Sequence, residues 1–169
     1  MPTDNQLPSI DDVGVVPSAE PLPLVLGEVF KADPNLWYNL RVTYTLRGDD
    51  NKKATGFLTP LAQNAATSFY EYMVLDSGWP ATKFKIHKPD PIGWSIWELE
   101  NGEFLSLKAT GWLYRSSAYP LGFQIVDNRL YNNYRGGTAG SAWKNGLVPS
   151  QYYTGVGCDE FICELVPIE

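Results

Sequence analysis

Lys83-Phe84-Lys85-Ile86 is the first of three short stretches with one pattern, and the others are Gly122-Phe123-Gln124-Ile125 and Glu160-Phe161-Ile162-Cys163. Each places a phenylalanine two positions before a second residue that can be buried, so both side chains point to the same face of a β-strand. The phenylalanines are evenly spaced, at steps of 39 and 38 residues from 84 to 123 to 161. Such spacing indicates an internal repeat, and it predicts three similar structural units.

The composition favours many short strands over helices. The 169 residues, a length typical of one domain, include 15 Gly, 13 Pro and 14% aromatic residues, but only 19% charged residues. The net charge of −6, with scattered acidic residues, argues against a nucleic-acid partner. No apolar run approaches the ~18 residues that a membrane span requires, so no membrane span is expected.

Residues 1–33 differ from the rest of the chain. Prolines recur in and directly after this stretch, and they interrupt helices and central strands. We expect an extended N-terminal arm whose segment Leu24–Phe30 packs on the body as an edge strand.

The N-terminus lacks the basic start and apolar core of a signal peptide, which predicts a protein that is cytoplasmic or released without one. Cys158 and Cys163 would face opposite sides of one strand, so we expect both to be reduced.

From residue 34 onward, alternating apolar and polar residues predict four strands in each unit, about twelve in all. The units are expected at about 34–90, 91–127 and 128–169. The second is the clearest, because Trp94–Leu99 and Phe104–Lys108 flank Asn101-Gly102. Asn-Gly between alternating apolar runs predicts a hairpin with a type I′ turn, in which both central residues have positive φ.

Three four-stranded units with a step near 40 residues, each ending in a phenylalanine-containing strand, resemble a β-trefoil, an all-β fold. The stretch from Trp94 to Leu107 resembles the opening hairpin of a ricin-B-like or mushroom lectin repeat. Such repeats commonly carry Gln-x-Trp in the last strand. Here the Gln position holds Thr82, Leu121 and Asp159, and phenylalanine replaces Trp. An acidic sugar ligand often follows the second-strand aromatic in those lectins, whereas this chain has Thr59 and Ser106 there. The resemblance implies a lectin-like protein of about residues 34–169, without the ricin-type galactose motif.

The sequence offers little for catalysis. His87 is its one histidine, and no Gly-x-Ser-x-Gly nucleophile motif is present. One histidine and two cysteines do not make a zinc site. Gly136-Gly137-Thr138-Ala139-Gly140 is expected to connect strands rather than to bind phosphate. The prediction is therefore a protein that is not an enzyme and that has neither metal nor cofactor.

Binding of a neutral sugar is the better-supported function. A receptor for the C–H face and hydroxyl rim of a sugar needs an aromatic ring beside short polar groups. Such residues gather in the third unit and, less densely, in the second. The candidate carbohydrate-binding residues are Tyr131, Asn132, Asn133, Tyr134, Arg135, Trp143, Asn145 and Tyr152, with Trp112, Tyr114 and Arg115.

Three alternatives remain open at the sequence level. A lectin-like subunit could bind a protein partner through the apolar, proline-rich arm and have no sugar site. A protease inhibitor would present a rigid loop, either 76–80 or 88–91. A different fold, a single eight-stranded barrel holding a small apolar ligand in its mouth, would also suit the alternation, because residues 35–39 and 141–145 resemble avidin-like strands.

Overall fold

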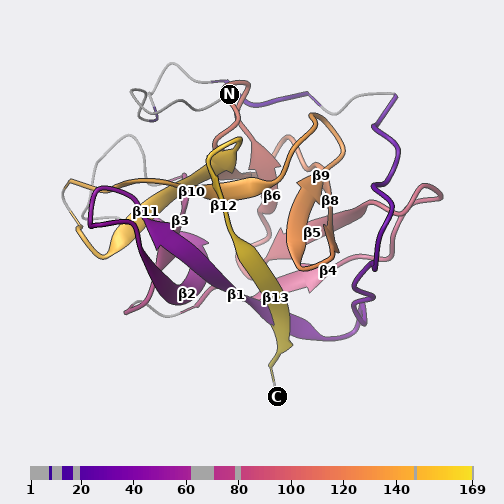
Figure 1. The fold of residues 1–169 in the computed structure, drawn as a ribbon. Coiled ribbons are helices and arrows are strands. Elements are labelled where there is room, and N and C mark those ends of the chain that lie inside the picture. Colours follow the sequence, from indigo (N-terminus) through magenta and orange to yellow (C-terminus); the bar gives the residue numbers. More distant parts are fainter. Residues whose placement is uncertain are drawn as a thin grey trace.

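A computed structural model describes residues 8, 13–16, 20–61, 71–78, 81–146 and 148–168. These residues form thirteen β-strands and no α-helix, so the all-β prediction is confirmed (Figure 1). No helix in these ranges is long and apolar enough to cross a membrane. The strands are β1 (Trp37–Leu46), β2 (Lys52–Pro60), β3 (Met73–Asp76), β4 (Phe84–Ile86), β5 (Ser95–Leu99), β6 (Phe104–Leu107), β7 (Leu113–Ser116), β8 (Gly122–Val126), β9 (Arg129–Asn132), β10 (Ala139–Lys144), β11 (Gln151–Val156), β12 (Asp159–Glu160) and β13 (Ile162–Pro167).

All strand pairs are antiparallel, and β1 and β5 each pair with three other strands. The partners of β1 are β2, β4 and β13. β4 pairs with β5, β5 with both β6 and β8, and β8 with β9. β3 joins β2 to β11, and β10 pairs with β11 and β12. Short hairpins therefore build most of the molecule, and strands distant in sequence lie side by side at β1–β13 and β3–β11.

The last predicted strand is interrupted, which explains thirteen strands where twelve were expected. Phe161 lies between β12 and β13. Its backbone N–H donates to Ala139 O (3.3 Å), whereas Cys163 N–H donates to Asn128 O (2.8 Å), so the two ends of the predicted strand have different partners. The number of strands and their pairing exclude the eight-stranded barrel. Alternation also predicts a strand from Ser68 to Leu75. Its first residues, 68–70, and the loop residues Trp79 and Pro80 lie outside the described residues.

The type I′ prediction at Asn101-Gly102 is wrong in its turn type, although the hairpin exists. Only Gly102 has a positive φ there (87°), and Gly102 N–H donates to Leu99 O (3.0 Å). This is a three-residue loop whose last residue is left-handed, the geometry in which glycine is favoured. Positive φ at two successive non-glycine residues occurs instead at Asp127 (50°) and Asn128 (64°), which join β8 to β9, and at Asp50 (54°) and Asn51 (49°), between β1 and β2.

Two clusters of buried side chains form the core. The larger one contains Phe84, Phe123 and Phe161, all at most 1% exposed. Trp97 lies between two of them, with ring centroids 5.6 Å from Phe84 and 6.2 Å from Phe123. The smaller cluster is built around Trp112, Tyr72 and Tyr153 with their neighbours. The three repeated phenylalanines thus share one core.

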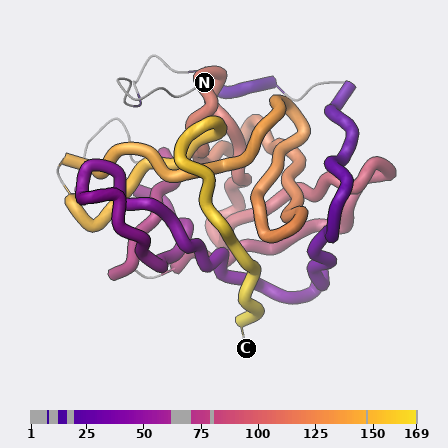
Figure 2. Tube along the Cα trace, in the orientation of Figure 1, coloured from indigo at the N-terminus to yellow at the C-terminus, as the bar shows by residue number. Residues whose placement is uncertain are grey.

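Residues 20–33 of the arm follow one side of the body, while residues 13–16 lie beside the end of β6, where Val15 N–H donates to Leu107 O (2.9 Å) (Figure 2). Phe30 N–H donates to Ile125 O (2.9 Å), and Val29 forms an isolated β-bridge with Val126. The Phe30 ring meets Tyr38 edge-on at 6.2 Å between centroids. The expected docking of Leu24–Phe30 is therefore observed, through a single bridge rather than a continuous edge strand.

Candidate functional site

Five of the predicted sugar-binding residues are buried. Trp112 and Tyr114 belong to the smaller core cluster, and the Tyr152 ring packs 6.0 Å from that of Tyr44. The Asn132 carboxamide oxygen accepts the N–H groups of two following residues and shapes the turn, while Asn145 bonds to Gln151. The five are 1–4% exposed, so little of these side chains remains for a ligand to touch.

The other predicted residues divide between three places. Tyr131, Asn133, Tyr134 and Arg135 follow one another from β9 into the connection to β10, and the Tyr134 ring is 40% exposed. Asn133 is tied to the arm, because its backbone oxygen accepts the Leu22 N–H (3.0 Å). Arg115 forms an ion pair with Glu103 on the neighbouring hairpin. Trp143 lies near the far end of β10, away from this connection.

Trp143 is half-buried, and a charged pair lies beside it. The Arg47 guanidinium carbon is 5.4 Å from the centre of the Trp143 ring, a cation–π arrangement. The same guanidinium binds Asp159 with two hydrogen bonds, from Nη2 to Oδ1 at 2.7 Å and from Nε to Oδ2 at 3.0 Å. We call Arg47, Trp143 and Asp159 the Trp143 surface. It combines part of an aromatic face with a fixed fork of donors and acceptors.

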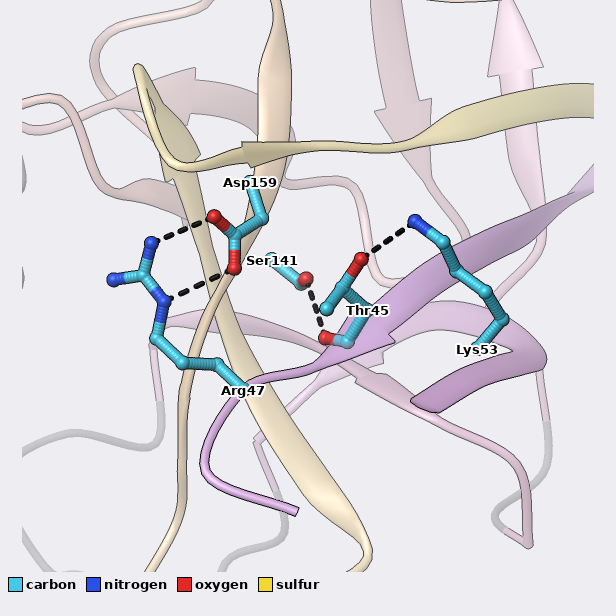
Figure 3. A network of polar contacts seen from close by, with 5 residues as sticks. All are labelled: Thr45, Arg47, Lys53, Ser141 and Asp159. Carbon is cyan, nitrogen blue, oxygen red and sulfur yellow. Dashed lines mark hydrogen bonds and ion pairs between the residues drawn. The ribbon is translucent and has the colours of Figure 1, made fainter. Parts of the chain in front are cut away.

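Further polar contacts join the strands beside the Arg47–Asp159 pair (Figure 3). Ser141 Oγ donates to the backbone oxygen of Thr45 at 2.8 Å, which connects β10 to the end of β1. Lys53 Nζ donates to the Thr45 hydroxyl at 2.7 Å. Because β1 and β10 are fixed to each other here, Arg47 and Trp143 are held at a set separation.

A second polar group lies next to Asp159 in sequence. The Glu160 carboxylate accepts hydrogen bonds from Thr138 Oγ1 (2.6 Å) and Arg129 Nε (2.8 Å). These bonds, from Thr138 first and then Arg129, lower the pKa of Glu160. Glu160 is therefore ionised near neutral pH and serves as an acceptor.

Trp37 is a second half-buried tryptophan with a cation above it. Lys85 Nζ lies 6.0 Å from the centre of the Trp37 ring, at the start of β1. No carboxylate binds this lysine in the described part of the chain. Trp37 therefore resembles Trp143 in exposure and ring contact but lacks the forked ion pair.

The Cys163 thiol is not activated in this structure. Its side chain is buried, and burial together with the Glu164 charge raises its pKa to about 12. Within the described ranges, no group of three or more His, Cys, Asp or Glu side chains is arranged to hold a metal ion.

Arg47 and Asp159 were not among the residues predicted to form the site. Arg47 lies between a predicted strand and the predicted turn at residues 48–51, and its partner Asp159 is 112 residues away in the chain. The one available signal was the position of Asp159, which stands where the lectin resemblance expects a polar Gln side chain. Only the pairing of β10 with β12 and the approach of β1 bring the two together.

No protein-family model matches the chain, and no match was found among curated proteins or solved structures.

Proposed function

We propose that this protein is a non-catalytic, lectin-like carbohydrate-binding protein with a β-trefoil fold, and that the Trp143 surface binds the sugar. The observation that carries the proposal is the half-buried Trp143 ring beside the bidentate Arg47–Asp159 pair. An aromatic ring can cover the C–H face of a sugar, and the charged fork can exchange hydrogen bonds with neighbouring hydroxyls. Because the ion pair is preorganised, little ordering entropy is lost on binding.

The strand pairing supports the trefoil. β1, β4, β5, β8 and β9 pair in succession, and β13 returns to β1. The Cys163–Asn128 hydrogen bond connects β13 to the β8–β9 turn, so six strands would complete a ring. Three hairpins are also joined pairwise, by the pairing of β3 with β11 and by isolated bridges at Tyr72–Tyr114 and Trp112–Gly155. This is the connectivity expected of three equivalent units.

The state of the carboxylates supports binding rather than hydrolysis. A glycosidase needs a carboxylic acid with a raised pKa near a second carboxylate. The Asp159 carboxylate is bound by the Arg47 guanidinium. The pKa of Glu160 is lowered by its hydrogen bonds, so Glu160 is ionised at a pH where a general acid would have to be protonated. Both groups are suited to accepting hydrogen bonds from hydroxyls.

A glycan array tests the proposal. The wild-type protein should bind a subset of neutral glycans, and Trp143→Ala should weaken that binding at least about tenfold, equivalent to ~1.4 kcal/mol. Trp37→Ala is the matched control, because it removes a similarly exposed ring on a different strand. It should leave binding within about twofold of wild type. Melting curves of both variants establish that they are folded.

Two results would contradict the carbohydrate site. If the wild-type protein binds no glycan on the array, the proposed function is wrong. If Trp143→Ala and Trp37→Ala lose glycan affinity equally, the proposed location of the site is wrong. A glycan that binds through Tyr134 instead would place the site in the β9–β10 connection.

A protein-binding subunit is the second candidate, favoured by apolar side chains exposed on the arm. Leu26 is 95% exposed, Val25 39% and Ile92, in the adjoining loop, 44%. Leu26→Asp should then remove partner proteins that the full chain captures from cell extract. An unchanged set of captured proteins would count against this surface.

A further inference from the structure

A cavity of about 370 Å³ separates the arm from the body. Leu24, Val29 and Phe30 line it from the arm, and Ile86 and Pro89 line it from the body. A 150 Å³ apolar cavity holds one benzene, and ligand pockets begin near ~300 Å³. This cavity therefore has room for a ligand of about ten to fifteen non-hydrogen atoms.

Hydrogen bonds on both sides of the cavity hold the arm in place. On one side, Leu22 N–H donates to Asn133 O (3.0 Å) and Trp94 Nε1 donates to Leu22 O (2.6 Å). On the other side, Phe30 N–H donates to Ile125 O (2.9 Å). The arm therefore bridges the cavity and keeps its apolar walls apart.

Two polar uncharged side chains, Ser95 and Gln124, line the cavity. Ser95, at the start of β5, is 2% exposed, and its hydroxyl makes no hydrogen bond within the part of the chain that the structure describes. Gln124 lines the same cavity but is satisfied, because its amide donates to Gly93 O (3.1 Å) and its oxygen accepts the Ile125 N–H (3.1 Å). The Ser95 hydroxyl is therefore available to donate a hydrogen bond to a ligand oxygen in the cavity.

The ionisable residues that line the cavity are basic types. Lys31 is exposed at the arm and makes no ion pair with any described residue. His87 Nε2 lies 2.8 Å from Glu98 Oε1. The nearby Asp90 carboxylate already accepts three backbone N–H groups, which include those of Gly93 and Trp94. The lining thus favours an anionic group beside Lys31.

We propose that this cavity binds a small apolar carboxylate of two-ring aryl or medium-chain alkyl type. The hydrocarbon part packs against Leu24, Phe30 and Ile86. The carboxylate pairs with Lys31, and Ser95 donates a hydrogen bond to a ligand oxygen. This site is formed by the arm and does not include the Trp143 surface, so it does not depend on carbohydrate binding.

Calorimetric titration with 2-naphthoate and with its neutral analogue 2-naphthylmethanol tests the site. The wild-type protein should bind one naphthoate per chain and bind the alcohol about tenfold more weakly. Lys31→Gln should abolish this preference, and Ser95→Ala should weaken binding of naphthoate several-fold. Lys52→Gln is the matched control, since it neutralises an exposed lysine on β2, and it should leave both affinities unchanged.

The proposal is overturned if naphthoate does not bind the wild-type protein or binds at many sites. It is equally overturned if both probes bind alike, or if Lys31→Gln and Ser95→Ala both bind naphthoate as the wild type does. The melting temperature of each variant shows whether the fold is intact. Lys31→Gln changes an exposed side chain, so it keeps the test decisive even if Ser95→Ala fails to fold.

Discussion

Tyr44 shows how burial in the core changes a single ionisable group. It is 1% exposed and packs against Tyr152. Burial first, and then the charges of Asp76 and Tyr152, raise its pKa from 10.0 to about 12. Because the folded-state pKa exceeds the unfolded value, the contribution to stability is fully present below pH 10 and is lost as the pH rises toward 12.

Tyr44→Phe should therefore make stability less dependent on alkaline pH. Between pH 9 and pH 11 the wild-type protein should lose roughly 1 kcal/mol more of its free energy of unfolding than the variant does. Urea denaturation at both pH values measures the difference. Tyr134→Phe, a change at an exposed ring, serves as the matched substitution. If the wild-type protein and Tyr44→Phe lose the same free energy of unfolding between the two pH values, the Tyr44 phenol does not contribute to the pH dependence of stability.

At the scale of single residues, the sequence predicted burial of the repeated phenylalanines but not the roles of polar and aromatic candidates. Trp112, Tyr152 and Trp143 are all large aromatic residues in or beside predicted strands. Trp112 and Tyr152 are buried, whereas Trp143 is half-buried. Alternation along a strand shows which residues share a face. It does not show which of the two faces another hairpin will cover.

Among the elements, the antiparallel pairing of β10 with β12 depends on the absence of a side chain at Gly140. A Cβ atom at this position would lie 2.2 Å from the backbone oxygen of Asp159, and backbone cannot move aside as a flexible side chain can. The close approach also positions Asp159 for Arg47. Gly140 therefore connects the packing of two strands to the geometry of the Trp143 surface.

Gly140→Ala should lower the free energy of unfolding by about 1–3 kcal/mol, because the extra methyl group forces the strands apart. Gly136→Ala is the control, since a Cβ atom there meets nothing within 4 Å, and its effect should stay within about 0.5 kcal/mol. Thermal and urea unfolding of the two variants measure the difference. Equal stability of the two would mean that β10 and β12 do not approach as closely as described.

Strands were the most predictable elements, and turns were less so. The alternation of apolar and polar residues predicts a strand from Trp37 to Leu46, and β1 has these bounds. The Asn101-Gly102 turn was located correctly but given the wrong geometry, because turn type also depends on the loop length that strand pairing sets. Asp127-Asn128 supplies two left-handed residues, which short polar side chains tolerate.

For the whole molecule, the arm is an integral part of the body. Phe30 is half-buried against the main core, whereas Leu26, four residues earlier, is 95% exposed. Phe30→Ala should lower the free energy of unfolding by about 1–2 kcal/mol, while Leu26→Ala should change it by less than about 0.5 kcal/mol. Urea denaturation compares them. If both variants match the wild type, the arm does not contribute to the stability of the fold.

The repeated pattern was enough to predict an all-β molecule with a shared core, because it sets which residues are buried together. Long-range contacts could not be predicted in the same way. The Arg47–Asp159 pair joins segments 112 residues apart, and the cavity needs the arm to lie across β4, β5 and β8. Neither follows from local periodicity, since each depends on how separate units are placed against one another.

Carbohydrate binding at Trp143 is tested most directly by the indole N–H signals of the six tryptophans in a ¹H–¹⁵N NMR spectrum. The glycan that binds most strongly on the array is added stepwise, and Trp143→Ala identifies the signal of that residue. We expect the Trp143 signal to shift progressively while that of Trp37 stays in place. A shift at Trp37 with none at Trp143, or no shift at any tryptophan, would contradict carbohydrate binding at Trp143.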